Sequence, residues 1–526
     1  MSIYVTPEDL NAALRDGEEL ALIDVREQGV FFDSHLFWAV CIPMSRLELH
    51  VQDLVPRAGT RIILCDDGRS SLAEEAIAVL ATLGYSNVRM LEGGTSAWGD
   101  AGYELYSGVN VPSKAFGEFV EVNYDTPRVP PEELNRIVES GRDMVILDSR
   151  PMDEYHRMNI PGGVDVPGAE LVYRVHEIAP DPETLVVVNC AGRTRSIIGS
   201  QSLINAGIPN AVIALKDGTM GWELAGFTCE HGSTEFGPDP SAEAVAVAQG
   251  RAAAVAGRFG VRFVDRATVQ DWQSDAERRT LYLLDVRTPE EFAAGHVAGS
   301  RHAPGGQLVQ ATDEHVGTRH ARIVLFDNEQ VRAVMTASWL IQLGWTDVHV
   351  YGGPVSDWTM ETGAKTATSP PIAECTTVAP VDVDTGTDFI LDLSDSLTYR
   401  REHIPGARWG VRSRLDEVAW PDAGRVVLYA DDERLAHLAA QSAATLATGD
   451  IVVLAGGLDA WRTAGQPVQA DDGKMTLATT ATNDVWYKPY DTDDQVRAKM
   501  EEYLVWEVGL VEQINRDETV HFEVFD

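Results

Sequence analysis

Short apolar segments alternate along this chain with stretches in which apolar residues recur every three or four positions. Four of the short segments have one form, an apolar strand that ends in an acidic residue. They read ALIDVRE, MVILDSRP, YLLDVRTP and FILDLSDS, with the acidic residue at Asp24, Asp148, Asp285 and Asp392. Strands of this kind between helical segments are typical of parallel sheets covered by helices. The pattern therefore predicts an α/β fold.

The same order of elements recurs four times. A second strand and its loop follow each of these strands, an amphipathic helix comes next, and a glycine turn with tryptophan ends the unit (GGTSAW, DGTMGW, GGPVSDW and GGLDAW). Units of about 100 residues are long enough for a core of their own. We predict small parallel sheets flanked by helices at residues 1–110, 122–232, 260–366 and 374–471, an alanine-rich helix at 241–259, and a C-terminal extension at 472–526.

The extension carries its own apolar pattern, in which Val496, Met500, Leu504 and Val508 recur at four-residue steps before Gly509. This spacing predicts an amphipathic helix that Gly509 ends or weakens. The helix either folds back over a repeat or forms a dimer contact. We expect residues 484–526 to stabilise the protein and to take no part in its chemistry.

The formal charge of −39 excludes some partners. A surface this negative repels nucleic acid and anionic membranes. The chain has no apolar run of membrane-spanning length, and its start lacks the basic and apolar regions of a signal peptide. We therefore expect a cytoplasmic protein that binds neither nucleic acid nor membrane.

Cysteine and histidine usage limits the cofactor chemistry. Five cysteines are scattered along the chain, which argues against a disulfide framework. There is no CxxC or HExxH pair, and neither GxGxxG nor GxxxxGKS is present. The sequence predicts no metal site and no cofactor.

One of the four second-strand loops differs from the others. Residues 186–196 read VVVNCAGRTRS, whereas the equivalent segments are IILCDDGRSS, IVLFDNEQVRA and VVLYADDERLA. A loop between a parallel strand and a helix gathers backbone N–H groups that favour an anion. Arg193 and Arg195 add positive charge, which is expected to lower the pKa of the Cys190 thiol. Gly192 allows a tight turn.

These elements together resemble the rhodanese (sulfurtransferase) family. The LDxR start, the IPGA-like turns (NIPGG, HVAGS and HIPGA), the Cys loop and the GGxxxW ending occur in family order over nearly the whole chain to about residue 471. The resemblance implies transfer of a sulfane sulfur through a cysteine persulfide. Cys190 would attack the outer sulfur of thiosulfate, release sulfite, and pass the sulfur to cyanide or a thiol.

The predicted site consists of the loop and a few supporting residues. Cys190 is the nucleophile, and Ala191, Gly192, Arg193, Thr194, Arg195 and Ser196 bind the anionic donor. Asp148 and Arg150 are expected to pair with each other or with backbone and to position the loop, and Glu154 to join them.

The other three loops are expected to be inactive. Cys65 aligns with Asn189 as the last residue of its strand, so Asp66, Asp327 and Ala430 occupy the nucleophile position. Cys65 is therefore expected to be a buried structural residue, as are Cys41, Cys229 and Cys375, which have no basic loop.

Several alternatives stay open from sequence. The protein could be a sulfur carrier or regulatory scaffold that delivers sulfur to a protein partner, or it could use 3-mercaptopyruvate as donor. A phosphatase is disfavoured, because related phosphatases have five residues between Cys and Arg and this loop has four between Cys190 and Arg195. A homodimer is a further possibility.

Overall fold

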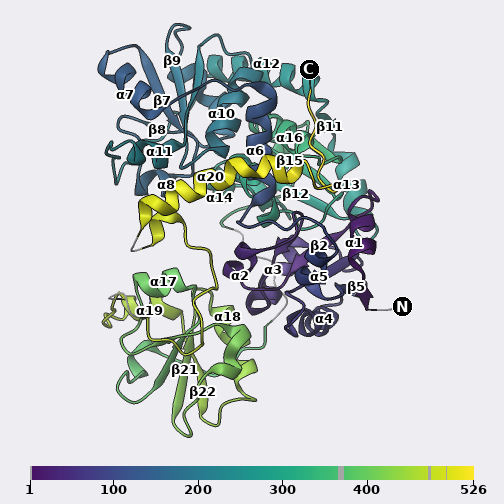
Figure 1. Ribbon diagram of the computed structural model, residues 1–526, viewed down its shortest axis with the longest axis vertical. Coiled ribbons are helices and arrows are strands. Elements are labelled where there is room, and N and C mark those ends of the chain that lie inside the picture. The colour runs from purple at the N-terminus through teal and green to yellow at the C-terminus, as the bar shows by residue number, and fades with distance from the viewer. Residues whose placement is uncertain (1–2, 365–371, 472–474, 493–494, 526) are drawn as a thin grey trace.

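The computed structural model describes residues 3–364, 372–471, 475–492 and 495–525. Four five-stranded sheets form successive units along the chain (Figure 1). In each sheet all paired strands are parallel, and the first strand of the unit lies at one edge with the last strand beside it. This confirms the predicted class of fold, four small parallel sheets flanked by helices.

The first two sheets have the same strand order, β1-β5-β4-β2-β3 and β6-β10-β9-β7-β8. The first contains β1 (Tyr4–Val5), β2 (Ala21–Asp24), β3 (Val40–Cys41), β4 (Ile62–Cys65) and β5 (Val88–Leu91), with α1 (Pro7–Leu14), α2 (Gln28–Asp33), α3 (Leu47–Leu54), α4 (Leu72–Thr82) and α5 (Gly94–Asp100). The second contains β6 (Arg128–Val129), β7 (Met144–Asp148), β8 (Val164–Asp165), β9 (Leu185–Asn189) and β10 (Val212–Leu215), with α7 (Pro131–Glu139), α8 (Met152–Arg157), α9 (Glu170–Ile178), α10 (Thr194–Asn205) and α11 (Gly218–Leu224).

The third and fourth sheets repeat this order as β11-β16-β15-β12-β14 and β18-β22-β21-β19-β20. The third has β11 (Arg262–Val264), β12 (Leu281–Asp285), β14 (Arg301–His302), β15 (Arg322–Phe326) and β16 (Val348–Tyr351), an antiparallel pair of β13 (His296–Val297) and β17 (Met360–Glu361), and α13 (Arg266–Ser274), α14 (Pro289–Ala294), α15 (Gly305–Gln310) and α16 (Val331–Gln342). The fourth has β18 (Thr377–Val378), β19 (Phe389–Asp392), β20 (Arg408–Trp409), β21 (Arg425–Tyr429) and β22 (Asp450–Leu454), with α17 (Ser396–Arg401), α18 (Glu433–Ala443) and α19 (Gly457–Thr463).

Three longer helices lie outside the sheets: α6 (Val111–Tyr124), α12 (Ala242–Phe259) and α20 (Val496–Ile514). The predicted alanine-rich helix is α12, and its small buried residues pack into a core shared by the second and third units. That core also takes in α6 and the end of α20, whereas buried clusters of the fourth unit are separate apart from Leu49. Figure 1 shows the fourth unit set apart from the other three.

The C-terminal helix differs from its sequence prediction. It continues through Gly509 to Ile514, and Val508 is half exposed. Its buried residues are Met500, Glu507, Leu510 and Ile514. It folds back along α6 and the second unit, where it crosses the middle of the molecule in Figure 1. Of the two predicted roles, the structure therefore shows the contact with a repeat.

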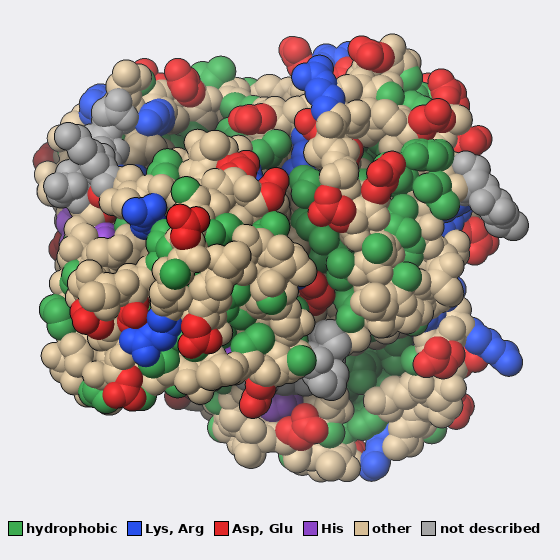
Figure 2. All heavy atoms as spheres, turned by 90° about the horizontal axis from the view of Figure 1, so that it is seen from below, with side chains coloured by type: hydrophobic (Ala, Val, Ile, Leu, Met, Phe, Trp, Pro, Cys, Tyr) green, Lys and Arg blue, Asp and Glu red, His purple; other side chains and the backbone are tan. Residues whose placement is uncertain are grey.

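Acidic side chains are spread over the face of the molecule seen in Figure 2. None of the helices in the described part of the chain combines the length and apolarity that a bilayer crossing needs.

Candidate functional site

Strand register gives the four second-strand loops a common frame. Asp24 pairs with Cys65, Asp148 with Asn189, and Asp392 with Tyr429 in the parallel ladders, and Asp285 pairs with Phe326 in the same way. The next residue in each unit is therefore the equivalent one. These residues are Asp66, Cys190, Asp327 and Ala430, as the sequence alignment predicts.

Cys190 lies at the start of a loop that is closed on its inner side. Its carbonyl accepts a hydrogen bond from the N–H of Thr219, 2.9 Å away, and Met220 donates similarly to Ala191. A Cβ on Gly218 would come within 2.2 Å of the Cys190 carbonyl oxygen, so only glycine allows this approach, at φ +54°. The glycine turn that ends the unit therefore supports the loop directly.

The outer side of the loop offers hydrogen-bond donors. Within the described part of the chain, no acceptor is found for the backbone N–H groups of residues 191–195. The Cys190 Sγ lies 3.6 Å from the Ser196 hydroxyl, and the Ser196 N–H also favours the thiolate. Unpaired N–H groups at the start of α10 form the kind of concavity that binds an anion.

The pKa of Cys190 is shifted in the direction opposite to the prediction. The residue is only 2% exposed, and burial raises the pKa of its thiol above the usual value. Arg195 and Ser196 lower the pKa but only partly offset burial. Glu507 raises the pKa further. The charges of the loop can be seen in its sequence, whereas its burial cannot.

The Arg193 side chain is buried and forms ion pairs with three carboxylates. Its guanidinium donates to Glu118 at 2.6 and 2.7 Å and to Asp217 at 3.0 Å, and it also pairs with Glu121. Glu118 and Glu121 come from α6, the helix that precedes the second unit. This side chain therefore fastens the loop to α6 and α11.

Arg195 and the predicted supporting residues form two ion pairs beside the loop. Arg195 makes a two-fold contact with Glu154 at 2.9 and 2.8 Å, and its proximity holds the pKa of that carboxyl, despite burial, at about 2. Arg150 pairs with Asp148 at 2.9 and 2.7 Å. Asn189 donates to the same Asp148, so this pair is anchored to the strand that leads to Cys190.

The C-terminal helix covers the loop, a feature the sequence reasoning missed. Ala191 and Met220 share a buried cluster with Met500, and a Cβ on Gly192 would lie 3.2 Å from Glu507 and 3.4 Å from Tyr503. The signal was present in the sequence, because Met500, Tyr503, Glu507, Leu510 and Ile514 recur at steps of three and four. A charged residue within this stripe marks an unusual position.

A second buried charge lies beside this helix. The Lys114 ammonium donates to the Val109 carbonyl at 2.7 Å and lies 5.0–5.2 Å from the rings of Trp486, Tyr503 and Trp506. Burial lowers its pKa to about 8, with Glu507 acting in the opposite direction. Cation–π contacts with three rings stabilise the charge, and no carboxylate in the described part of the chain pairs with it directly.

The equivalent loops of the first and third units are occupied by their own carboxylates. Asp66 accepts hydrogen bonds from the N–H groups of Gly68 and Ala73 and from the Ser70 hydroxyl. Asp327 accepts from the N–H groups of Arg332 and Ala333 and pairs with the Arg332 guanidinium. An anion is thus already bound at each of these positions.

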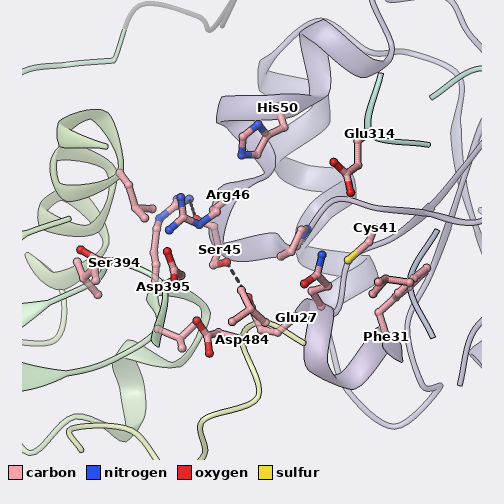
Figure 3. Close-up of a pocket in the computed structure, with 18 of the residues that line it drawn as sticks. Glu27, Phe31, Cys41, Ser45, Arg46, His50, Glu314, Ser394, Asp395 and Asp484 are labelled. Atoms are coloured by element: carbon pink, nitrogen blue, oxygen red, sulfur yellow. Dashed lines mark hydrogen bonds between the residues drawn. The ribbon is translucent and has the colours of Figure 1, made fainter. Parts of the chain in front are cut away.

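The remaining cysteines have surroundings unlike those of Cys190. Cys65 is fully buried, and burial with Asp24 nearby raises the pKa of its thiol. Cys41 lines a cavity of about 360 Å³ between the first and fourth units, where Figure 3 shows it near Glu27 and across from Asp484. Burial and then Asp24 and Glu27 raise the pKa of this thiol as well.

Among the described residues, no three His, Cys, Asp or Glu side chains are grouped so as to hold a metal ion.

Comparison with known proteins identifies the family of the chain. The rhodanese-like domain family matches residues 6–101, 130–225, 266–361 and 381–464; the outer boundaries of the units stay predictions. A crystal structure of thiosulfate sulfurtransferase from Pseudomonas aeruginosa is 46% identical, covers 100% of both chains and superposes with a TM-score of 0.94.

Curated relatives match segments about as long as one repeat. An HTH-type transcriptional regulator of Mycobacterium tuberculosis is 33% identical over 101 residues, which are 19% of this chain and 43% of that protein. The uncharacterized protein YqhL of Bacillus subtilis is 32% identical over 91 residues, 17% of this chain and 71% of that protein. The chain therefore belongs to the rhodanese family and is a rhodanese-type transferase built from four rhodanese-like domains.

Proposed function

We propose that the second domain transfers a sulfane sulfur from thiosulfate through a persulfide on Cys190, and that the other three domains do not carry out this chemistry. The observation that carries the proposal is the loop at residues 190–196. It has a cysteine at the position where the first and third domains have an aspartate, and the N–H groups of residues 191–195 have no acceptor among the described residues. The full-length relative named above acts on thiosulfate.

The reaction has two steps. The Cys190 thiolate attacks the outer sulfur of thiosulfate, a new S–S bond forms, and the bond to the sulfite group breaks with its electron pair leaving on sulfite. A nucleophilic acceptor then attacks the outer sulfur of the persulfide, and the Cys190 thiolate leaves. Burial raises the pKa of the thiol, so the thiolate depends on the donors around it, namely Arg195, the Ser196 hydroxyl and N–H, and the free N–H groups of the loop.

Each predicted site residue has a place in this proposal. Ala191, Gly192, Thr194 and Ser196 contribute the backbone and hydroxyl donors around the sulfur. Arg195, which lowers the pKa of Cys190, provides the nearby positive charge and is oriented by Glu154. Arg193 is assigned a positioning role through Glu118, and Asp148 with Arg150 supports the end of β9.

The test compares two cysteines at neighbouring positions in equivalent loops. After treatment with thiosulfate, intact-mass analysis and peptide mapping are expected to find one added sulfur, on Cys190. Cys190→Ser should abolish persulfide formation and sulfur transfer, and Cys65→Ser should keep most of the activity. Comparable losses in the two variants, or sulfur found on another cysteine, would refute the proposal.

The alternative of a carrier that delivers sulfur to a protein partner is less well supported. The α20 helix covers the loop at Gly192, which leaves a bulky acceptor no direct approach while the helix is in place. Turnover with small acceptors alone separates the two functions.

A further inference from the structure

Glu507 is a buried carboxyl group at the Cys190 loop that the steps above do not use. The residue is only 1% exposed. Its Oε1 accepts hydrogen bonds from the Tyr503 hydroxyl at 3.0 Å and the Thr194 hydroxyl at 3.4 Å. Its Oε2 has no partner among the described residues, and it lies 3.2 Å from the position a Cβ on Gly192 would take. One carboxyl oxygen is therefore free beside the loop.

The charged groups around Glu507 leave this oxygen available. Lys114 and Glu118 face it from α6, Arg193 and Cys190 from the loop, and Tyr503 from its own helix. Arg193 is engaged by Glu118, and Lys114 by the Val109 carbonyl. Burial raises the pKa of Glu507 to about 7, an effect that Lys114 partly offsets and Glu118 reinforces.

A structural role does not account for this arrangement. A buried carboxylate with an unpaired oxygen costs free energy that a glutamine or a leucine at the same position would avoid. A perturbed carboxyl beside a nucleophile is typical of acid–base chemistry. Its negative charge also disfavours binding of the dianionic thiosulfate, so Glu507 does not assist formation of the persulfide.

Resting on the proposed function, we propose that the sulfur acceptor is a small neutral thiol and that Glu507 removes its proton. The acceptor S–H gives its proton to the free Oε2 while its sulfur attacks the outer sulfur of the Cys190 persulfide. A bond forms between the acceptor and outer sulfurs, and the bond between the outer sulfur and Sγ breaks, leaving its electron pair on the Cys190 thiolate. The proton passes from Glu507 to solvent, and no external oxidant or reductant is consumed.

Two acceptors that differ in their need for a base test this role. Thiols have a pKa of about 8.5 and arrive protonated at neutral pH, whereas sulfite at pH 8 arrives largely ionised. In single-turnover reactions with the preformed persulfide, Glu507→Gln should slow transfer to 2-mercaptoethanol on the order of a hundredfold. Transfer to sulfite should be unchanged or faster, because a negative charge has been removed. Glu502→Gln, at an exposed position on the same helix, should leave both rates unchanged.

The pH profile gives an independent readout. Since Glu507 acts as a base only when ionised, the rate of thiol transfer in the unmodified protein should rise with pH through a midpoint near 7. In Glu507→Gln the rate should instead follow ionisation of the thiol itself, which has its midpoint at a distinctly higher pH.

Equal losses with both acceptors, or an unchanged midpoint, would overturn the role of Glu507 and assign it to structure. The persulfide is measured separately by mass before acceptor is added. Failure to form it in the unmodified protein refutes the proposed function, whereas normal formation followed by equal rates refutes only this inference.

Discussion

At the scale of single residues, the second domain combines a buried loop with several ion pairs. The N–H groups of residues 191–195 have no acceptor in the described part of the chain, whereas Arg193, Arg195 and Arg150 pair with carboxylates. Two arginines in a loop sequence suggest two charges available to a substrate. The structure shows both already bound to carboxylates, and Arg195 is the charged residue that most lowers the pKa of the Cys190 thiol.

Replacing Arg193 should therefore reduce stability first. Arg193→Ala leaves Glu118 buried without its partner, and breaking a buried ion pair in this way costs about 3–5 kcal/mol. We expect a lower melting temperature by calorimetry, and partial recovery when Glu118→Gln is added to the same chain. An unchanged melting temperature with a raised KM for thiosulfate would instead give Arg193 a direct role in donor binding.

Gly218 offers a sharper test of how the loop is supported. Gly218 and Gly457 are equivalent and have similar positive φ angles, +54° and +56°, so alanine strains the backbone alike at both. Only at Gly218 would the new Cβ lie within 2.2 Å of a loop carbonyl, compared with 3.1 Å at Gly457. Gly218→Ala should lower kcat at least tenfold and Gly457→Ala should leave it within a factor of two. Equal activity in steady-state assays would show that the loop does not depend on this contact.

At the scale of elements, the sequence was most informative where a local pattern determines the result. The acidic residue that ends each first strand fixes the alignment of the loops, and the ladders confirm it through pairs such as Asp148 with Asn189. The position of α20 could not be predicted in this way. Helical spacing identifies an apolar face, but the cluster of Met500 with Ala191 and Met220 joins residues about 300 positions apart, and no local rule specifies such partners.

The same limit applies at the site. Burial raises the pKa of Cys190, with a smaller contribution from Glu507 of α20, and Arg193 pairs with Glu118 of α6, so both residues have surroundings that come from outside the second repeat. The loop sequence shows the charges of Arg193 and Arg195. It does not show the burial and the paired carboxylates that determine how these charges affect the pKa of Cys190.

Covering by α20 should control access to the thiol. Met500 shares a buried cluster with Ala191 and Met220, so Met500→Ala opens space beside the loop. We expect iodoacetamide to modify Cys190 at least several-fold faster in this variant, measured by mass spectrometry of the Cys190 peptide. Val505→Ala, on the same helix but 74% exposed, is the matched control and should not change the rate. If both variants react like the unmodified protein, α20 does not limit entry.

At the scale of the whole molecule, the domains are joined unequally. The second and third share a core through α12, and Arg332 of the third pairs with Glu170 of the second at 3.1 Å. The fourth contacts the first mainly through polar groups such as Arg412 with Glu48 at 2.7 and 2.8 Å. Apolar burial rather than surface pairing determines which domains unfold together.

Calorimetry should therefore resolve two transitions. Val427→Ala removes buried atoms from the fourth domain and should lower only the transition assigned to it. Val324→Ala makes the same change at a fully buried position of the third domain and should lower the other transition. A single transition that both variants shift equally would show instead that all four domains unfold as one cooperative unit.

The carboxylates of Asp66 and Asp327 give their loops a permanent internal ligand, whereas the loop of Cys190 is complete only when something negative is bound. A ligand that binds only the folded state raises the free energy of unfolding with the logarithm of its concentration relative to its Kd. The loops of the first and third domains then make a fixed contribution to stability, whereas the contribution of the Cys190 loop rises and falls with its sulfur load. The protein would then unfold most slowly when the sulfur donor is abundant, so its lifetime would depend on the supply of donor.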